Sequence, residues 1–138
     1  MCADLARQLL ADAEGSAHDI AIEVVGAGNE DDAVEVARSV ARSNLFKCAV
    51  FGEDPNWGRV LASIGTTSAP FDVYAVDVRF NGVQVCLAGE AHADPASVGF
   101  DGRAVHIVID LHAGGATATV VTNDLTTAYV HENSAYST

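Results

Sequence analysis

The stretch that decides the fold class is Val76-Asp77-Val78-Arg79-Phe80-Asn81-Gly82-Val83-Gln84-Val85-Cys86-Leu87. Apolar residues occupy every second position on each side of Asn81-Gly82, which is the pattern of a strand with one buried face. Asn-Gly is the strongest short-range signal for a two-residue hairpin turn, because both residues tolerate the left-handed backbone that such a turn requires. The stretch therefore predicts two antiparallel strands joined by a tight turn.

A second pair of strands is predicted further along the chain. Alternating apolar residues run over residues 105–111, the turn is Ala113-Gly114-Gly115, and a strand rich in β-branched residues returns over residues 117–121. Residues 90–103 lie between the two pairs. They contain proline and glycine and show no period, so we expect a loop there.

Helical periodicity dominates the N-terminal half of the chain. Asn29 is placed to cap a helix whose first turn holds Glu30, Asp31 and Asp32, where the positive end of the helix dipole favours carboxylates. The apolar stripe of this helix follows at helical spacing: Ala33, Val36, Ala37, Val40 and Ala41.

Two shorter elements precede that helix. Residues 5–13 repeat leucine and alanine at helical spacing, which predicts a first helix. Residues 20–24 alternate Ile or Val with Ala and Glu, which is typical of a half-buried strand. The strand is expected to end at Gly26-Ala27-Gly28.

Three elements complete the prediction. A further strand, the second along the chain after that of residues 20–24, is expected over residues 48–51 and is followed by a loop over residues 52–56. A helix that carries Val60, Leu61 and Ile64 comes next, and a short helix is expected over residues 124–130.

The sum of these elements is an α+β fold, a mostly antiparallel sheet with helices packed on one side. A chain of 138 residues is long enough for one core and shows no interdomain linker, so residues 1–138 are predicted to form a single domain. No apolar run approaches the ~20 residues needed to cross a bilayer. We therefore expect a cytoplasmic protein without a signal sequence.

The composition excludes several kinds of partner. A formal net charge of −12 would repel a phosphate backbone, and no run of basic residues offsets it, so nucleic acid is not an expected partner. Cys2, Cys48 and Cys86 are far apart and form no Cys-x-x-Cys pair, which indicates reduced thiols. The five histidines show no metal-ligand spacing, so no metal site is predicted.

Gly26-Ala27-Gly28, between a strand and a helix, has two interpretations. Exposed backbone N–H groups at a helix start can hold phosphate. The third glycine of a dinucleotide-binding fingerprint would fall at Asp31, however, and the carboxylates of residues 30–32 would repel a pyrophosphate. We therefore favour a structural turn.

The segment Asp54-Pro55-Asn56-Trp57-Gly58-Arg59 is dense in residues with special roles. Pro55 fixes a backbone angle, Asn56 can cap the following helix, and Trp57 offers a large flat face. Residue types alone leave two interpretations open. One is a binding role; the other is structural bracing, with Trp57 in the core and Arg59 paired with Asp54.

Two longer segments and one short motif go beyond local structure. They are Lys47-Cys48-Ala49-Val50-Phe51-Gly52-Glu53-Asp54-Pro55-Asn56-Trp57-Gly58-Arg59, Thr122-Asn123-Asp124-Leu125-Thr126-Thr127-Ala128-Tyr129-Val130-His131-Glu132-Asn133-Ser134-Ala135-Tyr136-Ser137-Thr138, and Asp12-Ala13-Glu14-Gly15. Together they resemble signature segments of the bifunctional ornithine acetyltransferase / N-acetylglutamate synthase (ArgJ-type) family. The resemblance covers essentially the whole chain and is to the C-terminal part of the family's β chain. It implies that the fold is part of a larger α/β acetyltransferase fold.

The resemblance also implies an activity, acetyl transfer from N-acetylornithine to glutamate in arginine biosynthesis, with acetyl-CoA as a further donor in some members. The family's nucleophile is a Thr that self-cleavage of the precursor places at the start of the β chain. That Thr lies upstream of the position that matches Met1, so we expect no catalytic residue here and no activity from the isolated chain. No cofactor is implied. The implied partners are the α chain and the rest of the β chain, in an α2β2 heterotetramer.

Carried over residue by residue, the resemblance implies substrate contacts at three positions: Glu14, Asn133 and Thr138. A carboxylate such as that of Glu14 suits a substrate ammonium group. We expect support for the site from Asn56, Trp57 and Arg59. Two classes of function stay open, an acetyltransferase piece that needs the upstream segment, and a truncated, catalytically inactive remnant that only folds or associates.

Overall fold

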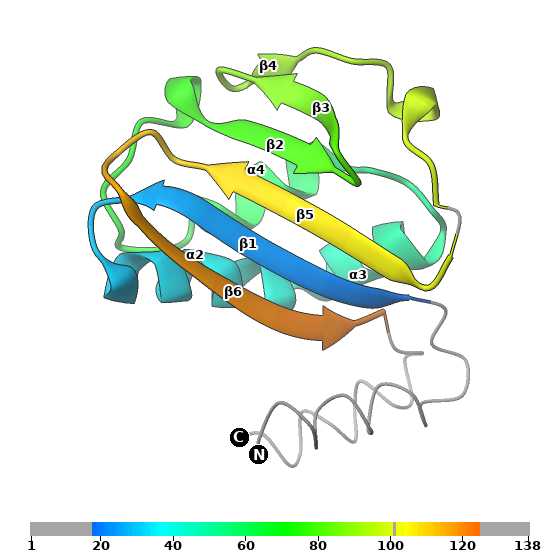
Figure 1. The fold of residues 1–138 in the computed structure, drawn as a ribbon, viewed down its shortest axis with the longest axis horizontal. Coiled ribbons are helices and arrows are strands. Elements are labelled where there is room, and N and C mark those ends of the chain that lie inside the picture. The colour runs from blue at the N-terminus through cyan, green and yellow to red at the C-terminus, as the bar shows by residue number, and fades with distance from the viewer. Residues whose placement is uncertain (1–17, 101, 125–138) are drawn as a thin grey trace.

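The structure, a computed structural model, describes residues 18–100 and 102–124. These residues form a six-stranded sheet in the order β4-β3-β2-β5-β1-β6, and the helices cover one of its two faces (Figure 1). The strands are β1 (Asp19–Ala27), β2 (Asp77–Phe80), β3 (Val83–Leu87), β4 (Glu90–Ala91), β5 (Ala104–Asp110) and β6 (Ala116–Asn123). The helices are α2 (Glu30–Ala41), α3 (Asn44–Phe51) and α4 (Trp57–Ile64), with single 3-10 turns η1 (Val73–Ala75) and η2 (Pro95–Ser97).

One pair of neighbouring strands is parallel, that of β1 with β5. The pairs β1–β6, β2–β3, β2–β5 and β3–β4 are antiparallel. The predicted fold class, a mostly antiparallel sheet with helices on one side, is therefore confirmed.

The hairpin of β2 and β3 follows the prediction from the Asn-Gly turn. Phe80 pairs with Val83 across the turn, and Asn81 and Gly82 have φ of 50° and 83°, the left-handed values that a two-residue hairpin requires. Alternation also placed the side chains correctly, since Val78 and Phe80 are fully buried. The strand begins at Asp77, because the preceding residues form η1.

Helix α2 also forms as predicted. The side chain of Asn29 accepts a hydrogen bond from the backbone N–H of Asp32 at 2.8 Å, which satisfies one of the unpaired donors at the helix start. All five residues of the predicted apolar stripe are buried against the sheet.

The strand predicted over residues 48–51 is wrong, since these residues form the second half of α3. Ser43 caps this helix and accepts from the backbone N–H of Phe46 at 3.1 Å. Phe46, Ala49 and Val50 then fall on one helical face and are buried. A four-residue apolar run fits a strand and a buried helix equally well, and the cap five residues earlier was the signal that distinguishes them.

The loop predicted over residues 90–103 is largely correct, with two small elements inside it. Glu90 and Ala91 form the short edge strand β4 on β3. The side chain of Asp94 accepts from the backbone N–H of Ala96 at 2.9 Å and begins η2, with Pro95 at its first position. These elements are too short to show a period in the sequence.

The core lies between the sheet and the helices. Its largest fully buried side chains come from strands and helices alike: Phe46, Phe80, Ile20, Ile22, Ile64, Ile107, Ile109, Leu111, Val24, Val36, Val40 and Val50. Phe46 of α3 and Phe80 of β2 pack as tilted rings with centroids 6.5 Å apart. No helix among residues 18–100 and 102–124 is long and apolar enough to cross a membrane. The helices predicted over residues 5–13 and 124–130 lie outside the described residues.

The structure favours the turn interpretation of Gly26-Ala27-Gly28. Gly26 has φ of +68°, and a β-carbon there would lie 2.4 Å from a carboxylate oxygen of Asp110 and 2.9 Å from the backbone nitrogen of His112. The register of β1 against β6 shifts between Val24 and Ala27. Glycine is therefore required by backbone conformation and by the close approach of the segment after β5.

A matched pair of substitutions tests this requirement. Gly82→Ala adds a methyl group where no atom lies within 4 Å, so it should cost only the left-handed strain, about 1–2 kcal/mol. Gly26→Ala carries the same strain and also collides with backbone, which should add about 1–3 kcal/mol. Urea unfolding of both variants measures the difference, and equal losses of stability would contradict the close-approach argument.

Candidate functional site

His18 is the centre of a buried polar cluster at the end of the sheet where β1 begins. Its side chain is 3% exposed and that of Asp124 is 0% exposed. The backbone N–H of His18 donates to one carboxylate oxygen of Asp124 at 2.7 Å, and ring Nδ1 lies 2.5 Å from the other. Asp124 thus holds His18 at two points across 106 residues of sequence.

The other side of the imidazole faces Glu53. Ring Nε2 lies 3.2 Å from a carboxylate oxygen of Glu53, whose side chain is 53% exposed. Carboxylates only accept hydrogen bonds, so an imidazolium, which donates from both nitrogens, satisfies both contacts. The ring of Phe100 packs edge-on against His18 at a centroid distance of 5.9 Å. We call His18, Asp124 and Glu53 the His18 cluster.

Glu53 is held in place by the loop between α3 and α4. It has φ of 57°, an uncommon value for a residue with a side chain. Its backbone N–H donates to the carbonyl oxygen of Val50 at 2.8 Å, and that of Asp54 donates to Ala49 at 2.8 Å. The C-terminal end of α3 therefore fixes the position from which Glu53 reaches His18.

The loop continues into the predicted support residues. Asn56 caps α4 as expected, accepting from the backbone N–H of Arg59 at 3.1 Å, and its amide donates to Asp54 at 3.3 Å. Trp57 is partly buried and packs against the core. Arg59 donates to the carbonyl oxygen of Leu45 at 2.6 Å, and the described residues include no ion pair between Arg59 and Asp54. Trp57 thus packs against the core as the bracing interpretation expected, whereas the ion pair that it expected is wrong.

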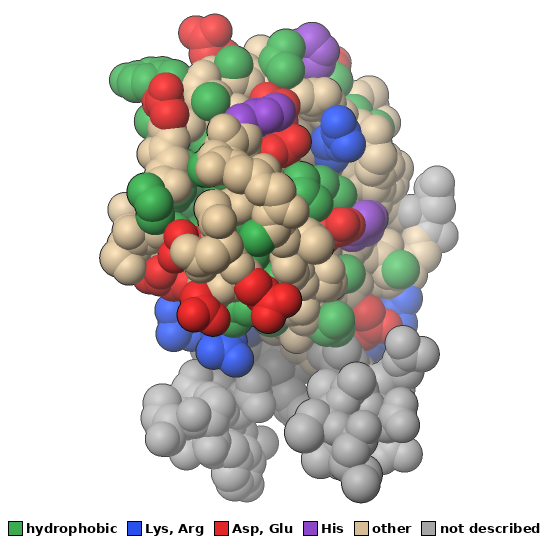
Figure 2. All heavy atoms as spheres, turned by 60° about the vertical axis from the view of Figure 1, so that its left-hand side comes forward, with side chains coloured by type: hydrophobic (Ala, Val, Ile, Leu, Met, Phe, Trp, Pro, Cys, Tyr) green, Lys and Arg blue, Asp and Glu red, His purple; other side chains and the backbone are tan. Residues whose placement is uncertain are grey.

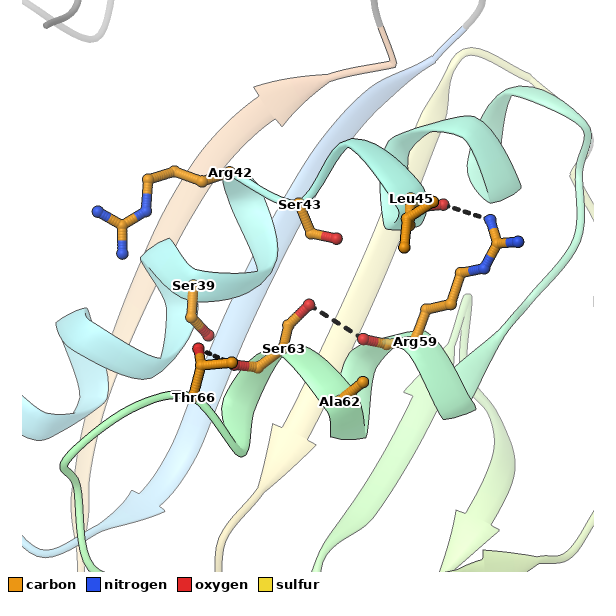
Figure 3. Close-up of a pocket in the computed structure, with 8 residues that line it drawn as sticks. All are labelled: Ser39, Arg42, Ser43, Leu45, Arg59, Ala62, Ser63 and Thr66. Carbon is orange, nitrogen blue, oxygen red and sulfur yellow. Dashed lines mark hydrogen bonds between the residues drawn. The ribbon is translucent and has the colours of Figure 1, made fainter.

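A groove of about 380 Å³ lies between the helices that cover the sheet. Its lining is rich in hydroxyl groups and contains two guanidinium groups: Ser39, Arg42, Ser43, Leu45, Arg59, Ala62, Ser63 and Thr66. The hydroxyls of Ser39, Ser63 and Thr66 donate to backbone carbonyl oxygens. The two guanidinium groups point toward opposite ends of the groove (Figure 3). The two guanidinium groups are therefore not arranged to bind one anion together.

Exposed histidines pair with carboxylates elsewhere on the surface, and Figure 2 shows histidine side chains beside acidic ones. Ring Nε2 of His106 lies 2.8 Å from a carboxylate oxygen of Glu23, and ring Nε2 of His112 lies 2.7 Å from a carboxylate oxygen of Asp77. The ligand atoms of Asp77, Asp110 and His112 all lie within 4.8 Å of one another, a spacing that could hold a metal ion. Sequence spacing missed this group because 35 residues separate Asp77 from His112.

Among residues 18–100 and 102–124, two titratable side chains are buried outside the His18 cluster. Burial lowers the pKa of the Lys47 amine in α3. Burial raises the pKa of the Cys86 thiol in β3. Cys48 and Cys86 are free cysteines, as predicted.

The structure tests the predicted site residues only in part. Glu14, Asn133 and Thr138, the predicted substrate contacts, lie outside the described residues. Asn56 and Trp57 lie in the segment that follows Glu53. His18 was not among the predicted site residues; it lies directly before β1, and nothing in the sequence indicated that it is buried. An isolated histidine with its partner 106 residues away leaves no local signal.

Comparisons with known proteins place this chain in a family. The family model described as the ArgJ family matches residues 1–138. A protein of Thermobifida fusca named "Arginine biosynthesis bifunctional protein ArgJ" is 60% identical over 138 residues, which is 100% of this chain and 36% of that protein. A protein of the same name from Streptomyces avermitilis is 61% identical over 137 residues, 99% of this chain and 36% of that protein. The chain thus spans about a third of the length of these curated relatives.

A solved structure gives the same result at the level of the fold. The crystal structure of "Arginine biosynthesis bifunctional protein argJ" from Bacillus halodurans matches with a TM-score of 0.84 at 32% identity. The match covers 98% of this chain and 65% of that chain. In that protein, a fold of this kind is therefore part of a larger one.

The exposed pair of His112 and Asp77 gives a pH prediction. The hydrogen bond to Asp77 raises the pKa of His112 above its ordinary value of 6.5. Burial alone would raise the pKa of Asp77, but hydrogen bonds from the Ala88 backbone and from His112 lower it below its ordinary 3.8. The charged carboxylate of Asp77 contributes its full stabilisation of the fold above about pH 4, and this contribution is lost as the pH falls through its lowered pKa. The charged imidazolium of His112 contributes its full stabilisation below about pH 6.5, and this contribution is lost as the pH rises through its raised pKa.

Asp77→Asn keeps an acceptor for Ala88 and removes the ion pair. Its destabilising effect should therefore be largest between about pH 4 and 6.5 and should shrink above the raised pKa of His112. Urea unfolding at pH 5 and pH 9 measures this, and nuclear magnetic resonance should show His112 titrating at lower pH in the variant. An equal loss of stability at both pH values would contradict the ion pair's role.

Proposed function

Since this chain belongs to the ArgJ family, we propose that it is the substrate-binding part of an enzyme that transfers acetyl from N-acetylornithine to glutamate. The observation that carries the proposal is the match over all 138 residues, at 60% identity to a relative named for arginine biosynthesis. Because the chain spans 36% of that relative, the activity is proposed for a complete enzyme that contains it.

The proposed chemistry is two successive acyl transfers. A threonine hydroxyl attacks the amide carbonyl of N-acetylornithine, the amide C–N bond breaks, and ornithine leaves with the proton that the hydroxyl gave up. The amine of glutamate then attacks the resulting ester, takes the acetyl group and regenerates the hydroxyl. Following the resemblance, the threonine and the oxyanion donors come from parts of the enzyme outside this chain. This route needs no metal or cofactor, and acetyl-CoA is a further acetyl donor in our proposal.

We assign substrate binding in this chain to Glu14, Asn133 and Thr138. Ornithine brings ammonium groups, so its recognition requires an acceptor for positive charge, which Glu14 supplies. We assign support of the site to the start of α4, where Asn56 caps the helix, Trp57 packs on the core and Arg59 joins α4 to α3.

The proposed setting follows from the same reasoning. The partners are the α chain and the remainder of the β chain in an α2β2 heterotetramer, and the compartment is the cytoplasm. The alternative is a truncated, inactive remnant that only folds or associates.

A chimera distinguishes the two functions. Residues 1–138 replace the matching segment of the Thermobifida fusca relative, and the purified protein is assayed for acetyl transfer from N-acetylornithine to glutamate. We expect turnover within about tenfold of the unaltered relative, since most misplacements at a site cost more than this. The control is the relative without the segment, which should be inactive. A folded chimera without turnover would favour the remnant.

A second experiment tests the role of Glu14 in that chimera. Glu14→Gln should preserve folding and lower kcat/KM for N-acetylornithine by about 1–3 kcal/mol of transition-state binding, the range for losing a charged hydrogen-bond partner. Glu23→Gln is the matched control, because Glu23 is an acid on β1 whose described partner is the exposed His106. Unchanged kcat/KM in Glu14→Gln would remove this residue from the site and leave Asn133 and Thr138.

A further inference from the structure

The chain has a single lysine, and the fold buries it. Lys47 lies in the middle of α3 and is 8% exposed, whereas the next residue, Cys48, is exposed. Val50, three residues further along the same face of the helix, is fully buried. Lysine is rarely buried to this degree unless another group accepts its hydrogen bonds. The burial of Lys47 therefore raises the question of what its amine does.

Lys47 has no such partner among the residues that the structure describes. The ion pairs within residues 18–100 and 102–124 join histidines or Arg103 to carboxylates, and none of them includes Lys47. Its amine takes part in no hydrogen bond there either, and burial is the one influence that lowers its pKa. The chain carries 19 acidic residues against 7 basic ones, so the unpaired state of Lys47 does not result from a shortage of carboxylates.

The nitrogen of Lys47 nevertheless stays in contact with solvent. Within the described ranges, the one fully buried side-chain nitrogen or oxygen atom that lacks a hydrogen-bond partner is Oδ1 of Asp19. The amine of Lys47 lacks a partner too and is not among the fully buried atoms, so its stem is covered while its tip reaches the surface. The opening is small, because the whole residue is 8% exposed. A small reagent can therefore reach this amine.

Burial also favours the reactive form of the amine. A lysine with the ordinary pKa of 10.5 is only ~0.1% neutral at pH 7.5, and the neutral form is the nucleophile. Burial lowers the pKa of Lys47, so a larger share of its amine is neutral than at an exposed position. Removal from water without a charged partner is one of the ways in which proteins activate a lysine as a nucleophile.

We propose that Lys47 is a site of covalent acylation, which takes the acyl group of a small acyl phosphate. The neutral amine attacks the carbonyl carbon, an amide C–N bond forms, the C–O bond to phosphate breaks, and the amine releases a proton to water. The amide is uncharged, so the modification removes the charge that burial disfavours. An aldehyde would instead give an imine, whose protonated form is a cation that burial penalises. This inference does not depend on the acetyl transfer to glutamate proposed above.

A competition between two lysines in one protein tests the proposal. Arg38→Lys introduces a second lysine at an exposed position of α2, the 138-residue variant is treated with acetyl phosphate, and mass spectrometry measures acetylation at both positions. At pH 7.5, we expect position 47 to be acetylated at least about threefold faster than position 38, because more of its amine is neutral. This ratio should fall as the pH rises to 10.5, where the amine at position 38 also loses its proton. In urea, the two positions should react equally.

A second measurement needs no acyl donor. Lys47→Met keeps an unbranched apolar stem and removes the amine, so an unpaired amine predicts a Tm equal to or above that of the unaltered chain. A lower Tm would show that the ammonium group has a partner and would overturn the proposal. Slower acetylation at position 47 than at position 38 at pH 7.5, or a ratio that stays the same at pH 10.5, would overturn it as well.

Discussion

The parallel pairing of β1 with β5 is the constraint on which the rest of this structure depends. Parallel strands cannot be joined by a tight turn, so the chain between Ala27 and Ala104 must cross a face of the sheet. The crossing carries α2, α3 and α4 before the β2–β3 hairpin joins the other side of β5. All three helices therefore cover the same face, and the loop between α3 and α4 returns to the end of the sheet where β1 begins, as the contact of Glu53 with His18 shows.

The two ends of the sheet are built around different residues. At the end where β1 stops, Gly26 passes close to Asp110 and the backbone of His112, and His112 pairs with Asp77 on the surface. At the end where β1 starts, His18 lies between a fully buried and a half-exposed carboxylate. In our proposal, the segments with the substrate contacts continue from this second end.

The sequence predicted those parts of the fold whose signals are local. The hairpin is fixed by Asn81-Gly82 and α2 by its cap at Asn29 and its apolar stripe, and both formed as expected. Helix α3 was mistaken for a strand because residues 48–51 are too short to show a period. The His18 cluster could not be predicted, since its buried pair spans 106 residues and no residue near His18 in sequence indicates a partner. Asn56 was predictable, because a cap lies next to the helix that it starts.

We propose that the substrate binds at the end of the sheet marked by His18 and Asp124. The most direct test is a crystal structure of the chimera with N-acetylornithine bound. We predict that the ligand lies at this end, with an ammonium group within hydrogen-bond distance of Glu14 and with the contacts of His18 to Asp124 and Glu53 intact. A ligand bound at the opposite end of the sheet, or in the groove between α2 and α4, would contradict the account.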